Sequence, residues 1–519
     1  MGFRQIKTEY LEPIIEYGIY FLVFLLPWQT RWIIKAGEME YLTYSLYGTD
    51  IILLAVLLLF AVLKCQKKSQ IQNPKFQINP NFQIPKFWYF VGLIDLFIFI
   101  SIFFASDKWL ALYKYGWFLL GVGLFWLIAS ANYNKVKLLW ALLAGVFLQA
   151  CLGAWQFLFQ SSFASKWLGL ARHNPAELGT SVVETIGADG LGERWLRAYG
   201  GLDHPNMLGG VLVIGVLVVI ELFLRNSKSE ILPPRRDPAP RPRFSGASPL
   251  ATAFCGVTPK ATTGRGKAVI NPKQIQNSKF KIQNTFFVFL FFCFLVFLLA
   301  LFFTFSRGAW AGAIVGILLM LFIFLMKKDF LKQRELLKII LASGILIFVL
   351  FNFYGDLVLT RLSKDTRLEI KSNTERMESF GQAKKMIKEK WLFGAGIGNY
   401  TLALQEMKPG QESWSYQPVH NVFLLVWAEV GFLGFLGFLG FLGFLGWSLI
   451  RGKKYFGLSI LAALVIMMMV DHWYWSLHFG VIFFFLIVGL ILINDKNEIN
   501  ESWVEARMKR NKTNRTNYN

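Results

Sequence analysis

The chain has 519 residues, of which 55% are hydrophobic, and it carries a formal net charge of +22 at pH 7. A soluble protein of this composition would have to bury apolar runs such as 51–63 and 286–303 in an ordinary core, whereas uncharged runs of about 20 residues can cross a bilayer. The cations lie between the apolar runs and form no continuous basic face, which disfavours nucleic-acid binding and favours a membrane protein with basic cytoplasmic loops.

The apolar runs predict an all-α, polytopic integral membrane protein with about twelve transmembrane helices. In chain order, the expected spans are 13–30, 46–63, 87–105, 113–130, 138–160, 205–224, 286–304, 309–326, 339–355, 420–449, 457–472 and 478–493. If the N-terminus is cytoplasmic, the cytoplasmic loops carry most of the 54 Lys and Arg residues, so both termini are expected inside. The bulky Pro27-Trp28-Gln29 after the first run is no signal-peptide cleavage site, so that run is interpreted as an uncleaved helix.

This arrangement divides the chain into five segments. The first six helices occupy 1–224, a core with a large external loop occupies 286–450, and the last helices occupy 451–493. Residues 225–285 are basic and poor in apolar residues, which predicts a disordered cytoplasmic loop, and 494–519 form a cytoplasmic tail.

Two long loops, 161–204 and 356–419, are expected on the outside, the second directly before the tenth span. In that second loop, Ser372-Asn-Thr-Glu375 has the pattern of a capping box, and apolar residues at helical spacing follow from Met377 to Trp391. This pattern predicts an amphipathic helix on the membrane surface or over a site. Within the tenth span, a glycine at every third position from Gly431 to Gly446 predicts close helix packing.

Ionisable side chains close to the spans gather at their outer ends, where they are candidates for function because charge is costly at membrane depth. They are Arg194 and Arg197, Asp203-His204-Pro205-Asn206, Arg307, His420-Asn421, Asp471-His472 and His478. Three of these groups begin a helix that runs inward, and such a helix start attracts anions through its unpaired N–H groups and its dipole. An arginine there matches two phosphate oxygens, and a histidine there can accept a proton from a hydroxyl. The pattern predicts a site for a phosphorylated or pyrophosphorylated headgroup.

Each group also has a purely structural interpretation. His204-Pro205-Asn206 could form a helix-start turn, and Asn421 could cap its helix while His420 is incidental. Arg307 could anchor lipid phosphates, the Asp471-His472 pair could be structural, and Arg194 and Arg197 could be solvated loop charges. The shared location of these groups is therefore the evidence for a site.

Several chemistries lack their sequence signatures. The chain has no Cys or His cluster with metal spacing, no Gly-x-Ser-x-Gly elbow, no Walker loop and no Asp-x-Asp pair. An ATP-driven or metal-dependent reaction is therefore disfavoured.

The order of motifs resembles that of the O-antigen ligase and O-antigen polymerase-like family of bacterial membrane glycosyltransferases. The matching pieces are Arg197-Ala-Tyr-Gly-Gly-Leu-Asp-His-Pro-Asn206, Thr304-Phe-Ser-Arg-Gly-Ala-Trp310, Arg376 with Trp391-Leu-Phe-Gly-Ala-Gly-Ile-Gly-Asn-Tyr400, and His420-Asn-Val-Phe-Leu424 with Glu429-Val-Gly431. The last three lie in the family's shared core, at roughly 286–450.

The resemblance implies a GT-C-like fold that transfers or polymerises a glycan from a polyprenyl-pyrophosphate donor onto a sugar hydroxyl of a glycan or glycolipid acceptor. The reaction would take place at the outer face of the inner membrane, among membrane lipids, without a metal, a cofactor, a nucleotide sugar or a nucleic-acid partner. By the same resemblance Arg197, Arg307 and Arg376 would hold the pyrophosphate, and His420 would be the general base. The further substrate-binding candidates are His204, Asn206, Asn421, Asp471 and His472.

Two questions stay open at this level. Ligases, repeat-unit polymerases and protein O-oligosaccharyltransferases share these motifs, and the sequence does not separate them. The alternative function is a transporter or flippase of lipid-linked glycans, which should place ionisable groups near the membrane midplane. The interiors of the expected spans are almost free of charge, which favours the enzyme.

Overall fold

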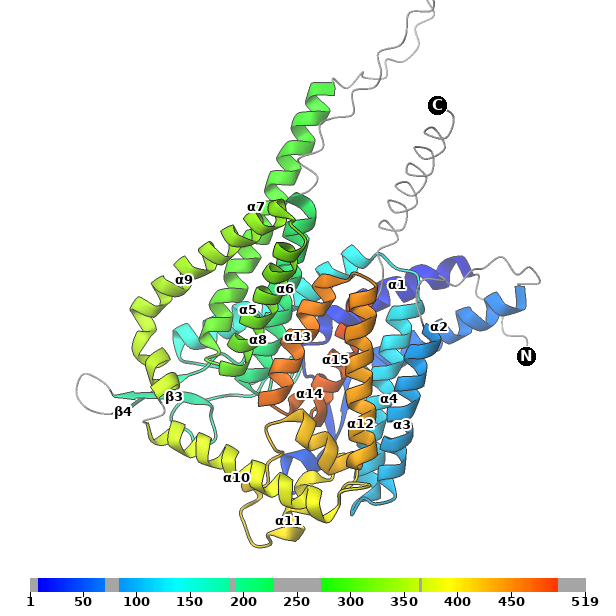
Figure 1. The fold of residues 1–519 in the computed structure, drawn as a ribbon, viewed down its shortest axis with the longest axis vertical. Helices are drawn as coiled ribbons and strands as arrows, with labels where there is room; N and C mark the ends of the chain where they lie inside the picture. Colours follow the sequence, from blue (N-terminus) through cyan, green and yellow to red (C-terminus); the bar gives the residue numbers. More distant parts are fainter. Residues whose placement is uncertain (1–7, 71–83, 187–191, 228–271, 364–365, 493–519) are drawn as a thin grey trace, which may run out of the picture.

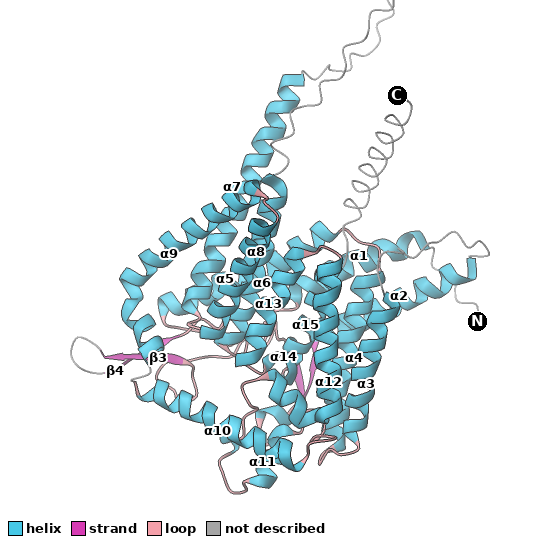
Figure 2. Cartoon of the chain, viewed as in Figure 1, coloured by secondary structure: helices cyan, strands magenta, loops and turns pink. Residues whose placement is uncertain are grey.

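The computed structural model describes residues 8–70, 84–186, 192–227, 272–363 and 366–492, and within these ranges most residues are helical (Figure 2). The N-terminal helices are α1 Thr8–Leu25, α2 Gly48–Gln70, α3 Ile84–Ile102, α4 Lys108–Ser130, α5 Lys135–Phe159 and α6 Pro205–Ser227. The next are α7 Pro272–Phe303, α8 Arg307–Met326, α9 Phe330–Ser363, α10 Arg367–Glu389 and α11 Tyr400–Met407. The last are α12 Val422–Arg451, α13 Tyr455–Val470, α14 Trp473–Ser476 and α15 His478–Leu492.

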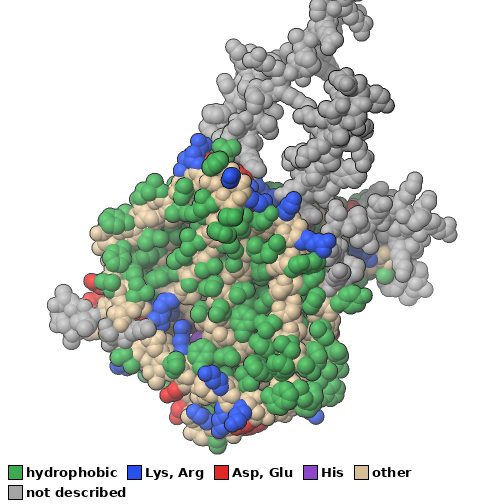
Figure 3. Space-filling model, in the orientation of Figure 1, with side chains coloured by type: hydrophobic (Ala, Val, Ile, Leu, Met, Phe, Trp, Pro, Cys, Tyr) green, Lys and Arg blue, Asp and Glu red, His purple; other side chains and the backbone are tan. Residues whose placement is uncertain are grey.

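Seven helical segments of the described chain are long and apolar enough to cross a membrane. They lie in α2, α4, α5, α6, α8, the stretch from α9 to α10, and α12, while α3, α7, α13 and α15 contain shorter apolar stretches. Each of the twelve expected spans overlaps one helix, although the number of twelve crossings stays a prediction. On the face drawn in Figure 3, a broad apolar band separates Lys and Arg side chains at its two ends, as expected for a membrane protein.

Helix α6 is the central helix of the bundle, and its most apolar window is 89% buried. It packs against α5, α7 and α8, and glycines along it allow close approach: Gly215 faces Val146 of α5 and Phe297 of α7, and Gly209 faces α8. A Cβ atom on Gly209 would lie 2.7 Å from the Ala309 Cβ, and one on Gly210 would lie 2.5 Å from the Trp473 ring. These close contacts fix the start of α6 against α8 and α14.

The starts of α6, α8 and α12 meet at one end of the bundle, called here the site end. Ser306 caps α8 by accepting a hydrogen bond from the Ala309 N–H, and Asn421 caps α12 by accepting one from the Leu424 N–H at 2.9 Å. The Asn421 amide also donates to the Met469 carbonyl at 2.8 Å, which joins the start of α12 to the end of α13. Side-chain caps therefore hold the helix ends in register.

Two antiparallel hairpins and two helices complete the site end. Strand β1 Arg31–Lys35 pairs with β2 Tyr44–Tyr47, and β3 Val182–Ile186 pairs with β4 Gly192–Leu196. Helix α10 crosses this end, with α11 beside it (Figure 1). The sequence analysis expected only loops at the two hairpins, because each pair is too short to show a clear alternation of apolar and polar residues.

The structure corrects the predicted start of the amphipathic helix. Helix α10 begins at Arg367 after Thr366, so Ser372-Asn-Thr-Glu375 lies inside the helix and is no capping box. The amphipathic character is confirmed, since Ala383 and Met386 are buried while Met377 is exposed. The expected apolar stripe is wrong at Met377 and at Trp391. Met377 is exposed because the helix buries the face that carries Met386, and Trp391 is exposed and follows the end of α10 at Glu389.

The glycine repeat packs against α3 over part of its length. Cβ atoms on Gly434 and Gly440 would each lie 3.3 Å from a phenylalanine of α3, whereas one on Gly443 would meet open space. The packing prediction is confirmed for this part of the repeat. Gly431 differs from the others, because α12 is broken there at φ 77°.

The expected disordered loop is helical at both edges. Helix α6 continues to Ser227, and α7 already begins at Pro272, so the prediction of disorder is wrong for these flanks of 225–285. Residues 228–271 and the expected tail 494–519 lie outside the described residues.

Candidate functional site

The site end brings most of the predicted residues into two adjoining groups. The arginine group consists of Arg307, Arg361 and Glu369. The histidine group consists of His204, Asn206, His420, Asp471 and His472. Arg197 connects the two groups.

The arginine group places one carboxylate between two guanidinium groups. Arg307 Nη1 lies 3.3 Å from Glu369 Oε2 and donates to the Arg361 carbonyl at 3.1 Å. Arg361 pairs with the other carboxylate oxygen of Glu369. The three side chains carry a net positive charge, and Arg307 Nη2 is buried without a hydrogen-bond partner. A buried donor with surplus charge is suited to binding an oxyanion.

The turn between α7 and α8 positions this group. Phe305 is fully buried in the left-handed conformation, with φ 46°, which is uncommon for a residue other than glycine. Its carbonyl accepts hydrogen bonds at 3.3 Å from both Nε and Nη2 of Arg361. The strained turn therefore orients Arg361 directly, and it presents Arg307 as the first residue of α8.

Arg197 is a buried connector and not a solvated loop charge. It is 4% exposed, and its guanidinium donates to the Thr304 carbonyl at 2.7 Å, to Ser181 Oγ at 2.7 Å and to Asn206 Oδ1 at 2.9 Å. The loop after β4 is thus tied to the α7–α8 turn and to the start of α6. Arg194, in contrast, lies 3.7 Å from Glu184 across the β3–β4 hairpin, as its structural interpretation predicts.

The histidine group is a chain of hydrogen bonds through Asp471. Asn206 Nδ2 donates to Asp471 Oδ2 at 2.7 Å, and the His472 backbone N–H donates to Asp471 Oδ1 at 2.8 Å. The Asn206 N–H donates to His204 Nδ1 at 3.1 Å. Asp471 therefore binds the backbone of His472, while the His472 ring pairs with Ser476 Oγ at 2.6 Å.

His420 lies at the edge of this chain with a free ring nitrogen. Its ring centroid is 5.1 Å from that of His472, at an interplanar angle of 78°. His420 Nδ1 is buried without a hydrogen-bond partner. Asn421 caps α12, as its structural interpretation predicts. The Nδ1 atom of the neighbouring His420, in contrast, makes no hydrogen bond.

Burial keeps the three imidazoles neutral. It lowers the pKa of His204 to about 3 and, against the opposing charge of Asp471, the pKa of His472 to about 4. Burial also lowers the pKa of His420, where Asp471 opposes the shift and the nearby Arg376 on α10 adds to it. Near neutral pH all three rings are therefore unprotonated.

Two histidines lie outside the histidine group. His478 Nε2 is 2.6 Å from Asp50 Oδ1, and its ring stacks on Tyr47 at 3.8 Å. His173 stacks on Tyr199 at 3.7 Å. Both contacts are the kind that hold a fold together.

The sequence analysis missed Arg361 and Glu369. Arg361 was assigned to an external loop, whereas α9 continues to Ser363 and carries it into the site. A lone arginine after an apolar run is the only local signal, and it does not indicate that Glu369 bridges Arg361 to Arg307.

The fold and the site define a multi-pass, helical membrane protein whose arginines and neutral histidines meet where helix ends converge. Residues 292–439 match the family model described as O-antigen ligase, which confirms the resemblance to the O-antigen ligase-like family. The chain is thus similar to O-antigen ligases over this segment. The matched segment contains the arginine group, Arg376 and His420, while Arg197, Asn206 and Asp471 lie outside it. No curated protein matches the chain.

Proposed function

We propose that the protein transfers or polymerises a glycan from a polyprenyl-pyrophosphate donor onto a sugar hydroxyl of a glycan or glycolipid acceptor. The reaction takes place at the outer face of the bacterial inner membrane, and both termini are cytoplasmic. The observation that carries the proposal is a pair of unpaired buried atoms at the site end. They are Arg307 Nη2, a positively charged donor, and Nδ1 of the neutral imidazole His420, and the charge of Arg376 acts on both of these residues.

The arginines bind the donor and stabilise its leaving group. Arg307 Nη2 donates to a pyrophosphate oxygen. Arg361 pairs with Glu369, so this one carboxylate faces two guanidinium groups and the arginine group keeps a surplus positive charge. Arg376 adds charge from α10. Arg197 is already hydrogen-bonded to three partners. It therefore adds positive charge to the site and holds Asn206 in position. Charge that develops on the departing pyrophosphate is stabilised by donors already in place.

His420 acts as the general base. The acceptor hydroxyl oxygen attacks the anomeric carbon of the donor sugar, the bond from that carbon to the pyrophosphate oxygen breaks, and the hydroxyl proton passes to His420. The carboxylate of Asp471 then stabilises the imidazolium, since it acts on the His420 ring electrostatically. His204, Asn206, Asn421 and His472 keep the helix ends and rings in position, and no step needs a metal or a cofactor.

The test is glycan transfer by the purified protein in liposomes that contain a lipid-linked glycan donor, an acceptor glycan and a chelator. Wild-type protein should form the joined glycan and release the lipid pyrophosphate, whereas His420→Ala should form almost none. Movement of the donor across the bilayer without a new glycosidic bond would instead identify a transporter.

A further inference from the structure

A row of exposed apolar side chains runs along the site end, partly on segments outside the expected spans. It is called here the aromatic ridge, and it is formed by strand β1, the last two turns of α5 and the loop that follows α5. Its members are Trp32, Ile33, Ile34, Trp155, Phe159, Phe163, Trp167 and Leu168, which are between 37% and 78% exposed. A contiguous exposed apolar surface usually marks a binding surface.

Aromatic contacts carry the ridge from α5 into the following loop. The Trp155 ring centroid is 5.9 Å from the centroids of Phe159 and Phe163. Further along, Ser165 and Leu170 exchange two backbone hydrogen bonds at 2.9 Å, which closes a tight loop. The ridge residues at the tip of this loop are therefore held in a fixed arrangement.

The same loop is fastened to the start of strand β1. Thr30 Oγ1 donates to the Trp167 carbonyl at 2.8 Å, directly before the strand begins at Arg31. Gly169 has φ 66°, and a Cβ atom there would lie 2.3 Å from the carbonyl carbon of Gln29, so glycine permits this close approach. The three parts of the ridge are thus joined into one surface.

Strand β1 is exposed on both faces and along one edge. All five of its side chains are exposed, and successive side chains of a strand point to opposite faces. Its sheet has two strands, so the edge of β1 away from β2 pairs with no other strand of the described chain. On β2, in contrast, the Tyr113 hydroxyl bonds both the N–H and the carbonyl of Ser45. A free apolar edge such as that of β1 invites pairing with another chain unless something covers it.

The second hairpin, β3–β4, has a similar size and lies at the same end, but it exposes polar side chains. Glu184 lies 3.7 Å from Arg194 and 3.0 Å from Arg367. The Trp195 ring packs inward, with its centroid 5.9 Å from that of Phe157. This hairpin is suited to water. The apolar surface of β1 is therefore a property of that strand and is not shared by both hairpins of the site end.

The ridge lies directly at the ends of two candidate spans. Helix α2 begins at Gly48, the residue after the end of β2, and α5 ends at Phe159, shortly before Phe163. Both helices are long and apolar enough to cross a membrane. These short connections keep the ridge at the level where the two spans leave the bilayer, and the ridge continues the exposed apolar surface of α5.

Two opposing requirements determine the depth of the ridge. Apolar side chains are stabilised by leaving water, whereas the unpaired backbone groups of a free strand edge cannot enter the hydrocarbon core. Both requirements are met in the headgroup region, where tryptophan is enriched and lysine reaches the lipid phosphates. Lysines accompany the ridge, since Lys166 Nζ lies 5.3 Å from the Trp167 ring and Lys35 Nζ lies 6.0 Å from the Tyr44 ring.

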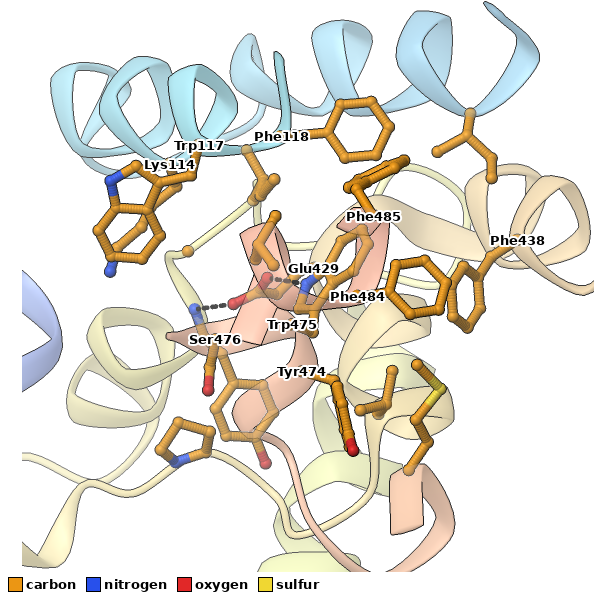
Figure 4. Close-up of a pocket in the computed structure, with 18 of the residues that line it drawn as sticks. Lys114, Trp117, Phe118, Glu429, Phe438, Tyr474, Trp475, Ser476, Phe484 and Phe485 are labelled. Atoms are coloured by element: carbon orange, nitrogen blue, oxygen red, sulfur yellow. Dashed lines mark hydrogen bonds between the residues drawn. The ribbon is translucent and has the colours of Figure 1, made fainter. Parts of the chain in front are cut away.

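The inner side of the same hairpin adjoins the histidine group. Tyr41, between the two strands, lines the pocket around Lys114 and Glu429 (Figure 4). Its ring centroid is 5.9 Å from that of His472, and its hydroxyl donates to Gln417 Oε1 at 2.9 Å. A contact that holds the hairpin at the membrane surface therefore also sets the depth of the histidine group.

We propose that the aromatic ridge inserts into the headgroup region of the membrane leaflet at the site end. The partner is the lipid surface itself, with the apolar side chains at the upper ends of the acyl chains and the lysines among the headgroups. This contact anchors a hairpin that does not span the membrane, and it holds the site end at a fixed depth. The inference does not depend on glycan transfer.

The full-length protein in lipid nanodiscs can test the proposal with the fluorescent probe NBD. The native cysteines, Cys65, Cys151, Cys255 and Cys293, are replaced by alanine, and the probe is attached to Ile34→Cys or Leu168→Cys protein. A lipid with a doxyl group near its headgroup should remove most of the fluorescence at both positions, whereas iodide in the water should remove little. Glu193→Cys, on the exposed part of β4, is the matched control and should respond in the opposite way.

Two other results would each overturn the proposal. Quenching by iodide alone at Ile34 and Leu168 would show that the ridge faces water. Protection from both quenchers would show that protein covers the ridge, as in a dimer paired through β1. Phe163→Cys, which is also a ridge position, replaces either variant if that protein fails to fold.

The unaltered protein provides an independent measurement. Nanodiscs made with a phosphatidylcholine that carries a diazirine group near its headgroup are irradiated, and the labelled peptides are identified by mass spectrometry. Lipid adducts should appear on 31–35 and 163–168 as well as on the end of α5, and they should be absent from β3–β4. Adducts on α5 without any on 31–35 or 163–168 would also overturn the proposal. Neither measurement requires enzyme activity.

Discussion

The arginine group and the histidine group lie side by side, but burial has opposite consequences for them. The arginine group stays charged, because Glu369 neutralises only one of its two guanidinium groups. The histidine group is also buried, but there burial lowers the pKa of each imidazole, so the three rings are neutral although the Asp471 carboxylate opposes the shift. The first group is therefore suited to holding an anion, and the second to accepting a proton.

This difference in charge fits the two tasks proposed for the site, which are anion binding and proton transfer. Arginine retains its proton even when it is buried, whereas burial of histidine favours the neutral ring. In the proposed mechanism, residue type thus decides which group binds the donor and which accepts the proton. Variants of the arginine group should lose donor binding, and variants of the histidine group should lose the transfer rate. The following experiments measure these two losses separately.

The largest effect is expected for His420→Ala. The rate of glycan transfer should fall about a hundred- to ten-thousandfold, because the general base is lost, while donor binding stays unchanged because the arginines hold the donor. Transfer and donor binding are measured on the same purified protein. A variant that keeps more than about a tenth of the wild-type rate would move the base to His204 or His472.

Arg307→Lys should reduce transfer about ten- to a hundredfold. An ammonium cannot replace the planar fork that contacts Glu369 and leaves Nη2 for the pyrophosphate, and a hydrogen bond to a charged group contributes about 1.5–3 kcal/mol. Arg194→Lys is the matched control, since that arginine pairs within a hairpin and should tolerate the change. Wild-type turnover by Arg307→Lys protein would contradict the pyrophosphate role, and a weakened donor affinity would support it.

Acidification should slow the reaction through the histidine group. The imidazole of His420 must be neutral to accept a proton, so the rate falls as pH decreases through its pKa and rises as pH increases. Because burial lowers that pKa, half of the maximal rate is expected below pH 6.5. Donor binding by the arginines should change little over the same range. A transfer rate that increases on acidification would exclude a histidine base.

The smallest effect on the transfer rate is expected for Asn421→Ala. This variant removes the N-cap of α12 and leaves the neighbouring His420 in place. Loss of an N-cap side chain costs about 0.5–2 kcal/mol of unfolding free energy, and the bond to the Met469 carbonyl is lost with it. The melting temperature should decrease, while the rate per folded molecule stays close to wild type. An unchanged melting temperature together with a rate as low as that of His420→Ala would reverse the two roles.

Much of the fold is predictable from local sequence. Each expected span overlaps a helix, because a membrane-length apolar run has few other stable conformations. The helix starts at Arg307 and Asn421 were also located, since a polar residue before an apolar run marks a cap. The errors fall where segments are short or amphipathic, as at the two hairpins and at the start of α10.

The sequence by itself determined the helical membrane class, the resemblance to O-antigen ligases, and the collection of arginines and histidines at one end. These features depend on composition and on residues close together in the chain. Only the tertiary structure decided that Glu369 bridges Arg307 and Arg361. It also decided that the guanidinium of Arg197 is already hydrogen-bonded within the protein, and that Nδ1 of His420 has no hydrogen-bond partner. Those outcomes depend on which buried groups find partners, and the partners come from helices that the chain brings together only when it folds.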